Sequence, residues 1–136
     1  MQLTAEQEER LVRAAWEARR HAYAPYSRFA VGAAVMADDG EIFAGCNVEN
    51  AVYGATLCAE RVAVGQAVAS GRRRLVAVAV VAETPSPTTP CGTCRQVLSE
   101  FAQDMPVVID NGRQRWRFRL AELLPQAFSR SHLDGR

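Results

Sequence analysis

Three cysteines and their spacing are the feature of this sequence best suited to chemistry. Cys91 and Cys94 are separated by two residues, follow a proline and open a predicted helix, and Cys58 lies where a loop passes into a second predicted helix. The dipole of a helix N-terminus lowers the pKa of a thiol, so two facing N-termini would favour three thiolates at one point. Three protein ligands leave the fourth tetrahedral position of Zn²⁺ open for water, as in catalytic zinc sites.

Glu60 would supply this predicted zinc site with a proton carrier. It follows Cys58 by two residues, and on a helix that offset places a carboxylate beside the metal rather than on it. Such a carboxylate can take a proton from activated water and pass it to a substrate nitrogen. The combination of Cys-x-Glu and Pro-Cys-x-x-Cys resembles the signature of the zinc deaminases.

Other interpretations of the cysteines stay open at this stage. Taken alone, Cys91 and Cys94 could be a redox dithiol, half of a closed zinc site or two core thiols. Their place two thirds along the chain argues against a thioredoxin-like unit, where the pair would follow the first strand. The fourth cysteine, Cys46, could complete a structural site, but it ends a predicted strand and is better explained as a small buried apolar residue.

The rest of the composition limits where other chemistry could arise. All 16 basic residues are arginine, which excludes a Schiff-base lysine and a P-loop lysine. The two histidines, His21 and His132, lie near opposite ends of the chain. A formal net charge of +1 gives no reason to expect a nucleic-acid partner, and the alternating arginines at 113–119 are interpreted as solvent or interface residues.

Five segments, taken in order, resemble the small cytidine deaminases. They are residues 26–33, 45–50, 58–61, 90–96 and 123–128, and the resemblance covers nearly the whole chain. It implies hydrolytic deamination of free cytidine and 2′-deoxycytidine to uridine and 2′-deoxyuridine plus ammonia, in pyrimidine salvage. A zinc-activated hydroxide would attack the base, with Glu60 as proton shuttle. Cys58, Cys91 and Cys94 would bind one Zn²⁺ per subunit.

The resemblance also implies how a small nucleoside would bind. Its contacts would be Asn47 and Glu49 with the sugar hydroxyls, Phe29 with the pyrimidine ring, the Ala59 backbone with the base, and Tyr53 near the sugar. Phe128 would reach into the site of a neighbouring subunit, because the family is typically homotetrameric. The active sites would then lie at subunit interfaces.

Charge arithmetic predicts a use for two of the arginines. Three thiolates and Zn²⁺ sum to −1, and an anionic site is a poorer Lewis acid. Arg61 directly follows Glu60, and Arg95 directly follows Cys94. Hydrogen bonds from both guanidinium groups to ligand sulfurs would withdraw charge and restore the acidity of bound water.

Two competing functions remain open. Related zinc deaminases act on nucleoside drugs such as blasticidin S, on free bases or on polynucleotides. Asn47 and Glu49 favour a substrate with free sugar hydroxyls, and the short, nearly neutral chain disfavours a polynucleotide. The other alternative is a non-catalytic structural zinc module, which would have no need of Glu60 beside an open coordination position.

The elements that must position these residues follow from the hydrophobic pattern. A capping box at Thr4 and Gln7 starts a helix that runs to about Tyr23. The later elements are strands at 31–36 and 41–46 joined by a turn, a loop at 47–56, a helix from about 57 to 71, a doubly apolar strand at 75–82, a loop at 83–90, a helix from 91 to about 103, strands at 106–110 and 116–120, and a short helix at 124–128. This order predicts a single α/β domain over residues 1–136, with helices on both faces of a mixed five-stranded sheet, a three-layer α/β/α fold.

The first residues and the longest apolar run indicate the cellular compartment in which the protein is expected. The first ten residues are polar and acidic, unlike a signal peptide, and the longest apolar run, 75–82, is far too short for a membrane span. The sequence therefore predicts a cytoplasmic protein without a membrane partner. In that compartment the cysteines are expected as thiols or metal ligands.

Overall fold

Five strands form one mixed sheet in the computed structural model, which describes residues 2–102 and 104–134. They are β1 (Gly32–Ala37), β2 (Ile42–Cys46), β3 (Leu75–Val81), β4 (Pro106–Asp110) and β5 (Arg115–Arg119), in the spatial order β2-β1-β3-β4-β5. β3 and β4 are parallel, and the other neighbours are antiparallel. The predicted mixed five-stranded sheet is confirmed.

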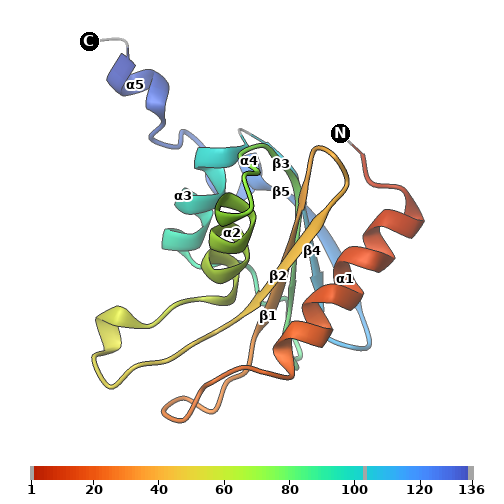
Figure 1. Ribbon diagram of the computed structural model, residues 1–136. Coiled ribbons are helices and arrows are strands. Elements are labelled where there is room, and N and C mark those ends of the chain that lie inside the picture. The colour runs from red at the N-terminus through yellow and green to blue at the C-terminus, as the bar shows by residue number, and fades with distance from the viewer. Residues whose placement is uncertain (1, 103, 135–136) are drawn as a thin grey trace.

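Helices cover both faces of this sheet, as Figure 1 shows. Helix α1 (Ala5–Arg19) buries Leu11, Val12 and Ala15 against one face. On the other face, helices α2 (Ala59–Ala69) and α3 (Gly92–Phe101) pack against a second core. β1 and β3 lie between the two cores, and their side chains are almost all buried, which explains why the 75–82 run is apolar on both sides. The three-layer prediction is confirmed.

The N-terminal helix starts as predicted and ends early. The Thr4 hydroxyl accepts a hydrogen bond from the Gln7 backbone at 3.1 Å, and the Gln7 side chain accepts one from the Thr4 backbone at 2.9 Å. The helix ends at Arg19 rather than near Tyr23. The reason is tertiary: Tyr23 pairs with the segment after β2, donating to the Asn47 carbonyl and accepting from the Glu49 amide.

The C-terminal elements differ more from the prediction. β5 stops at Arg119, and helix α4 occupies Leu120–Leu123 instead of 124–128, because the Glu122 carboxylate accepts from the Arg119 backbone and starts the helix there. A further short helix, α5 (Arg130–Asp134), was not predicted, and it projects away from the body of the molecule (Figure 1). The predicted end of the third helix at residue 103 lies outside the described residues.

The arginines of β5 do not form a free basic surface. Arg115 bonds Asp110 of β4 at 2.9 Å, Arg117 bonds Glu8 of α1 at 2.6 Å, and Arg119 bonds Asp104 in the segment before β4 at 3.0 Å. These pairs leave the Arg117 and Arg119 side chains 60% and 41% exposed, so the interpretation of the β5 arginines as solvent or interface residues stays a prediction. Among the described residues, no helix is long and apolar enough to cross a membrane.

Candidate metal centre and active site

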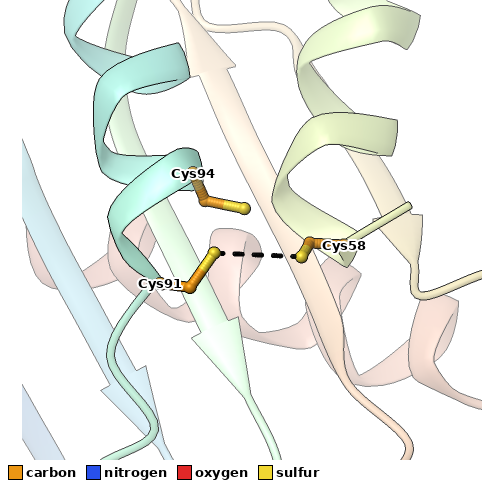
Figure 2. A group of neighbouring side chains, drawn as sticks. All are labelled: Cys58, Cys91 and Cys94. Carbon is orange, nitrogen blue, oxygen red and sulfur yellow. Dashed lines mark hydrogen bonds between the residues drawn. The ribbon is translucent and has the colours of Figure 1, made fainter. Parts of the chain in front are cut away.

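Three thiols meet where two helices begin. Cys58 is the N-cap of α2, Cys91 is the N-cap of α3, and Cys94 lies in the first turn of α3. Figure 2 shows the three side chains pointing toward one another from the two helices. Their sulfur atoms all lie within 4.8 Å of one another, and those of Cys58 and Cys91 are 4.0 Å apart. Cys46, half-buried at the end of β2, belongs to no such cluster of the described residues.

The geometry of the thiols fits a tetrahedral zinc ion. Zn–S bonds of ~2.3 Å in a tetrahedron place sulfur atoms ~3.8 Å apart, which is close to the separation of Cys58 and Cys91. Hydrogen bonds from the thiol of Cys94 and the guanidinium of Arg61 hold the pKa of the Cys58 thiol well below its ordinary value. Thiolate is the form that binds zinc, so Cys58 is suited to the metal in charge, whereas the hydrogen bond to Cys58 and burial raise the pKa of the Cys94 thiol.

Glu60 is buried next to this cluster. It is the second residue of α2 and is only 5% exposed, and it lines the same cavity as Cys58 and Cys91. Burial raises the pKa of Glu60 to about 7. A carboxyl that titrates near neutral pH can both accept and release a proton during a reaction.

Gly45 determines how closely α2 approaches the sheet. A side-chain carbon at this position of β2 would lie 2.7 Å from the Ala63 backbone nitrogen and 2.8 Å from the Ala59 carbonyl oxygen. Both atoms belong to α2, the helix that carries Glu60 and begins at Cys58. The absence of a side chain at residue 45 therefore lets the first turn of α2 sit at its observed place.

We expect Gly45→Ala to destabilise the protein by about 1–3 kcal/mol, because the new methyl group overlaps α2 backbone that cannot move without repacking. It should also lower zinc affinity, since α2 carries one ligand. The control is Gly65→Ala on the exposed part of the same helix, where an added carbon meets nothing within 4 Å. That change should raise stability by up to about 1 kcal/mol. Urea unfolding measures the stability of both variants, and equal stability of Gly45→Ala and Gly65→Ala would contradict the prediction.

Arg61 makes the bond to a ligand sulfur that the sequence predicted. Its Nη2 donates to the Cys58 sulfur at 3.7 Å and to the Thr56 carbonyl at 3.0 Å. The second bond ties the guanidinium to the loop before α2. Its Nε is buried and has no hydrogen-bond partner among the described residues. Arg61 is thus placed to withdraw charge from one thiolate.

Arg95 does not make the corresponding bond. Its three nitrogens donate to the Pro90 carbonyl at 2.7 Å, the Leu123 carbonyl at 2.7 Å and the Thr89 hydroxyl at 3.0 Å. The prediction that Arg95 contacts a ligand sulfur is therefore wrong. The Arg95 guanidinium instead donates to backbone carbonyls at the end of α4 and before α3. These bonds hold the loop that leads into Cys91.

A cavity of about 230 Å³ opens beside the thiols. Of the residues predicted to bind substrate, four line it: Phe29, Asn47, Glu49 and Ala59. A larger cavity of about 630 Å³ lies beside Trp16 and is lined by none of the cysteines, so its position argues against a role in zinc chemistry. The smaller cavity is the candidate active site, because it joins Glu60 and two thiols to the predicted sugar-binding residues.

Asn47 and Glu49 hold the loop that carries Phe29. Asn47 donates to the Phe29 carbonyl at 2.7 Å and accepts from the Val31 amide at 3.0 Å. Glu49 accepts hydrogen bonds from the backbone of Tyr26 at 2.9 Å and from the backbone and hydroxyl of Ser27. Both side chains therefore have a structural task in addition to the predicted contact with a sugar.

Two predicted substrate contacts lie away from the cavity. Tyr53 is 75% exposed in the short 3₁₀ helix η1 (Tyr53–Ala55), where its ring meets the edge of Tyr26. Phe128 is 57% exposed and stacks on His132. Neither lines the cavity formed by the described residues of this one chain.

Seven residues that line the cavity were not among the site residues predicted from the sequence. Ser27, Thr88 and Thr89 are three of them. Their positions carried a signal, because Ser27 lies in the segment with Phe29, and the two threonines directly precede Pro90 and Cys91. Side-chain hydroxyls in loops are common, however, and their type alone does not indicate a site.

Comparison with known proteins decides the family. Residues 5–109 match the family model described as the cytidine and deoxycytidylate deaminase zinc-binding region. The chain belongs to this family. The family and the cluster of Cys58, Cys91 and Cys94 together fit one Zn²⁺ per subunit, and the predicted enzyme class, a zinc-dependent deaminase, is confirmed.

Individual deaminases are similar over nearly the whole chain. A cytidine deaminase of Sporosarcina psychrophila is 49% identical over 128 residues, which are 93% of this chain and 94% of that protein. The 1.6 Å crystal structure of cytidine deaminase from Burkholderia pseudomallei has a TM-score of 0.85 and 47% identity, covering 93% of this chain and 100% of that one. A blasticidin-S deaminase of Bacillus cereus is a more distant relative, 30% identical over 74% of this chain and 78% of that protein.

Proposed function

We propose that this deaminase hydrolyses free cytidine and 2′-deoxycytidine to uridine and 2′-deoxyuridine, with release of ammonia. One observation carries the proposal: the buried Glu60 carboxyl lines the same small cavity as two of the three thiols. A structural zinc module has no use for such a group. The similarity to cytidine deaminases, which is much greater than that to blasticidin-S deaminase, supports the choice of substrate.

The residues of the chain divide the reaction between them. Cys58, Cys91 and Cys94 would hold Zn²⁺, which when bound supplies Lewis-acid activation of a water molecule for attack on C4 of the pyrimidine. Glu60 accepts the proton of that water and delivers it to N3. Glu60 then takes the second proton from the new C4 hydroxyl and gives it to the amino group, which leaves as ammonia as the C4 carbonyl forms. Burial suits Glu60 to both steps, because its pKa lies near neutrality.

The cavity residues orient the nucleoside for these steps. We assign Phe29 to the face of the base, the Ala59 backbone to the edge of the base, and Asn47 and Glu49 to the sugar hydroxyls. Ala59 is the first residue of α2 and adjoins Glu60, so a base held there presents its ring to the proton carrier. Holding the reacting atoms together in this way removes the entropic cost of bringing them into contact.

The test is the loss of ultraviolet absorbance that accompanies conversion of cytidine to uridine. Purified protein with measured zinc content is assayed in parallel on cytidine, 2′-deoxycytidine, cytosine and blasticidin S. We expect turnover of the two nucleosides, at least tenfold lower kcat/KM for the others, and about one zinc per chain. A zinc-loaded protein inactive on both nucleosides would overturn the proposal.

Arg61→Ala is expected to lower kcat by about tenfold or more and to raise KM much less. The removed hydrogen bond withdraws charge from the Cys58 sulfur, so its loss weakens the Lewis acid without removing a substrate contact. Steady-state kinetics on cytidine measure the two constants separately. The matched control is Arg73→Ala, an exposed arginine in the turn after α2. An unchanged kcat in zinc-loaded Arg61→Ala would remove this role for Arg61.

We further propose a homotetramer whose active sites lie at subunit interfaces. The support is a concentration of exposed large apolar side chains in two neighbouring loops, formed by Tyr23, Tyr26, Phe29, Val48, Val52, Tyr53 and Leu57. In the assembly, Phe128 of one subunit would reach the cavity of another and Tyr53 would approach the sugar. Light scattering should give four times the chain mass, whereas a fully active monomer would contradict the assembly.

We place this reaction in pyrimidine salvage in the cytoplasm, carried out by residues 1–136 as one catalytic domain. The support is chemical. All four cysteines are free, and free cysteines are typical of compartments that keep thiols reduced.

A further inference from the structure

The Ser27 hydroxyl joins two residues of the proposed nucleoside site. It accepts a hydrogen bond from the Phe29 backbone amide at 3.0 Å and donates one to the Glu49 carboxylate. The backbone amide of Ser27 also donates to Glu49, at 3.1 Å. Ser27 thus forms a relay from the backbone of the ring-bearing residue to the carboxylate proposed to bind the sugar.

The turn that carries Phe29 depends on these bonds. Arg28, between Ser27 and Phe29, has a φ of +59°, in the left-handed region that residues with a side-chain carbon disfavour. Asn47 holds the Phe29 carbonyl from the other side at 2.7 Å. Both backbone polar groups of Phe29 are therefore fixed, one by Asn47 directly and the other by Glu49 through Ser27.

The same bonds determine what Glu49 and Asn47 can offer a ligand. An ionised carboxylate has about four acceptor positions, and three on Glu49 are taken by Tyr26 and Ser27. The hydrogen bond from the Ser27 hydroxyl also lowers the pKa of Glu49, which keeps the group ionised and purely an acceptor. Asn47 uses one amide hydrogen and one oxygen position, leaving a donor and an acceptor. The free acceptor of Glu49 and the free donor and acceptor of Asn47 match two neighbouring hydroxyl groups of a sugar.

We propose that Ser27 is a positioning residue for nucleoside recognition. It orients the free acceptor of Glu49 toward the sugar and, through the Phe29 amide, holds the Phe29 ring against the base. The inference rests on the proposed function, since it assigns Phe29 and Glu49 to a nucleoside. Ser27 need not touch the substrate itself, because it acts through its two partners.

The kinetic test compares Ser27→Ala and Ser27→Thr with the wild type on cytidine and on 2′,3′-dideoxycytidine. Ser27→Ala should raise KM for cytidine about tenfold, the effect of losing a hydrogen bond to a charged group, and change kcat less than threefold. KM for 2′,3′-dideoxycytidine should rise only about two- to threefold, because this nucleoside has no 2′- or 3′-hydroxyl to bond Glu49. Ser27→Thr should restore most of the lost affinity, because residue 27 is exposed and has room for a methyl group. The control is Ser99→Ala, whose hydroxyl donates to the Gln96 carbonyl of its own helix.

A second measurement does not depend on turnover. Hydrogen exchange of the Phe29 amide, followed by NMR without substrate, should be at least tenfold faster in Ser27→Ala than in the wild type and unchanged in Ser99→Ala. Three results would each overturn the proposal: an unchanged KM for cytidine in Ser27→Ala, an equal rise in KM for cytidine and 2′,3′-dideoxycytidine, or an unchanged exchange rate of the Phe29 amide. An inactive wild type would overturn the proposed function instead, and the exchange rate would still decide whether Ser27 holds Phe29.

Discussion

Replacing Glu60 with glutamine is expected to lower kcat on cytidine by about 10²–10⁴-fold while zinc remains bound, the range for loss of a positioned proton-transfer group. Glutamine has the same shape and can form hydrogen bonds, but it cannot take up and release a proton. Because Glu60 lies beside the thiols without belonging to the ligand cluster, the metal should be retained. The loss should therefore fall on the chemical step and not on assembly of the site.

Three measurements separate these effects. Absorbance kinetics give kcat and KM, metal analysis gives zinc per chain, and thermal unfolding reports folding. Glu100→Gln, the same change at an exposed position of α3, serves as the control and should retain full activity. A Glu60→Gln variant that keeps both zinc and full activity would show that the proton passes through another group.

The second large effect is expected from Cys94→Ala, which should reduce bound zinc from about one per chain to below detection and abolish measurable deamination. Cys94 is the fully buried member of the cluster, and two remaining thiols cannot make a closed set of protein ligands. Zinc that binds only the folded chain also stabilises it. At free zinc near 100 times Kd its loss lowers the free energy of unfolding by about 3 kcal/mol.

Cys46→Ser is the matched control for this prediction. Cys46 is a half-buried thiol at the end of β2, outside the cluster, so its variant should keep zinc and activity. Treatment of the wild type with a strong chelator should reproduce the loss of activity and the lowered unfolding temperature, and added zinc should reverse both. Zinc loss in Cys46→Ser with zinc retained in Cys94→Ala would exchange the roles of the two cysteines.

The parts of the fold that the sequence predicted are those governed by local chemistry. The capping box at Thr4 depends on side chains three residues apart, and β3 is recognised by a run of apolar residues. The boundaries that were missed depend on remote partners. Tyr23 leaves the helix to pair near Asn47, and the helix after β5 begins early where Glu122 caps it.

The candidate site shows the same division. Residue type and spacing were sufficient to propose Cys58, Cys91 and Cys94 as ligands and Glu60 as the proton carrier, because thiolate chemistry and the pattern Cys-x-Glu are unusual enough to be specific. The arginines were less predictable. A guanidinium is long and has several donors, so Arg61 reaches a sulfur whereas Arg95 satisfies carbonyls at the ends of α4 and the 83–90 loop.

The sequence by itself determined the family resemblance, the order of the elements and which residues could do the chemistry, since these depend on residue type and near-neighbour spacing. Only the tertiary structure decided that Glu60 is buried and that Asn47 and Glu49 hold the loop of Phe29. It also decided that Ser27 links the Phe29 amide to the Glu49 carboxylate. It also left Tyr53 and Phe128 outside the cavity of their own chain. The physical reason is that burial and hydrogen bonding depend on segments that the fold brings together from distant parts of the chain. Each donor can also bond any of several acceptors within its reach.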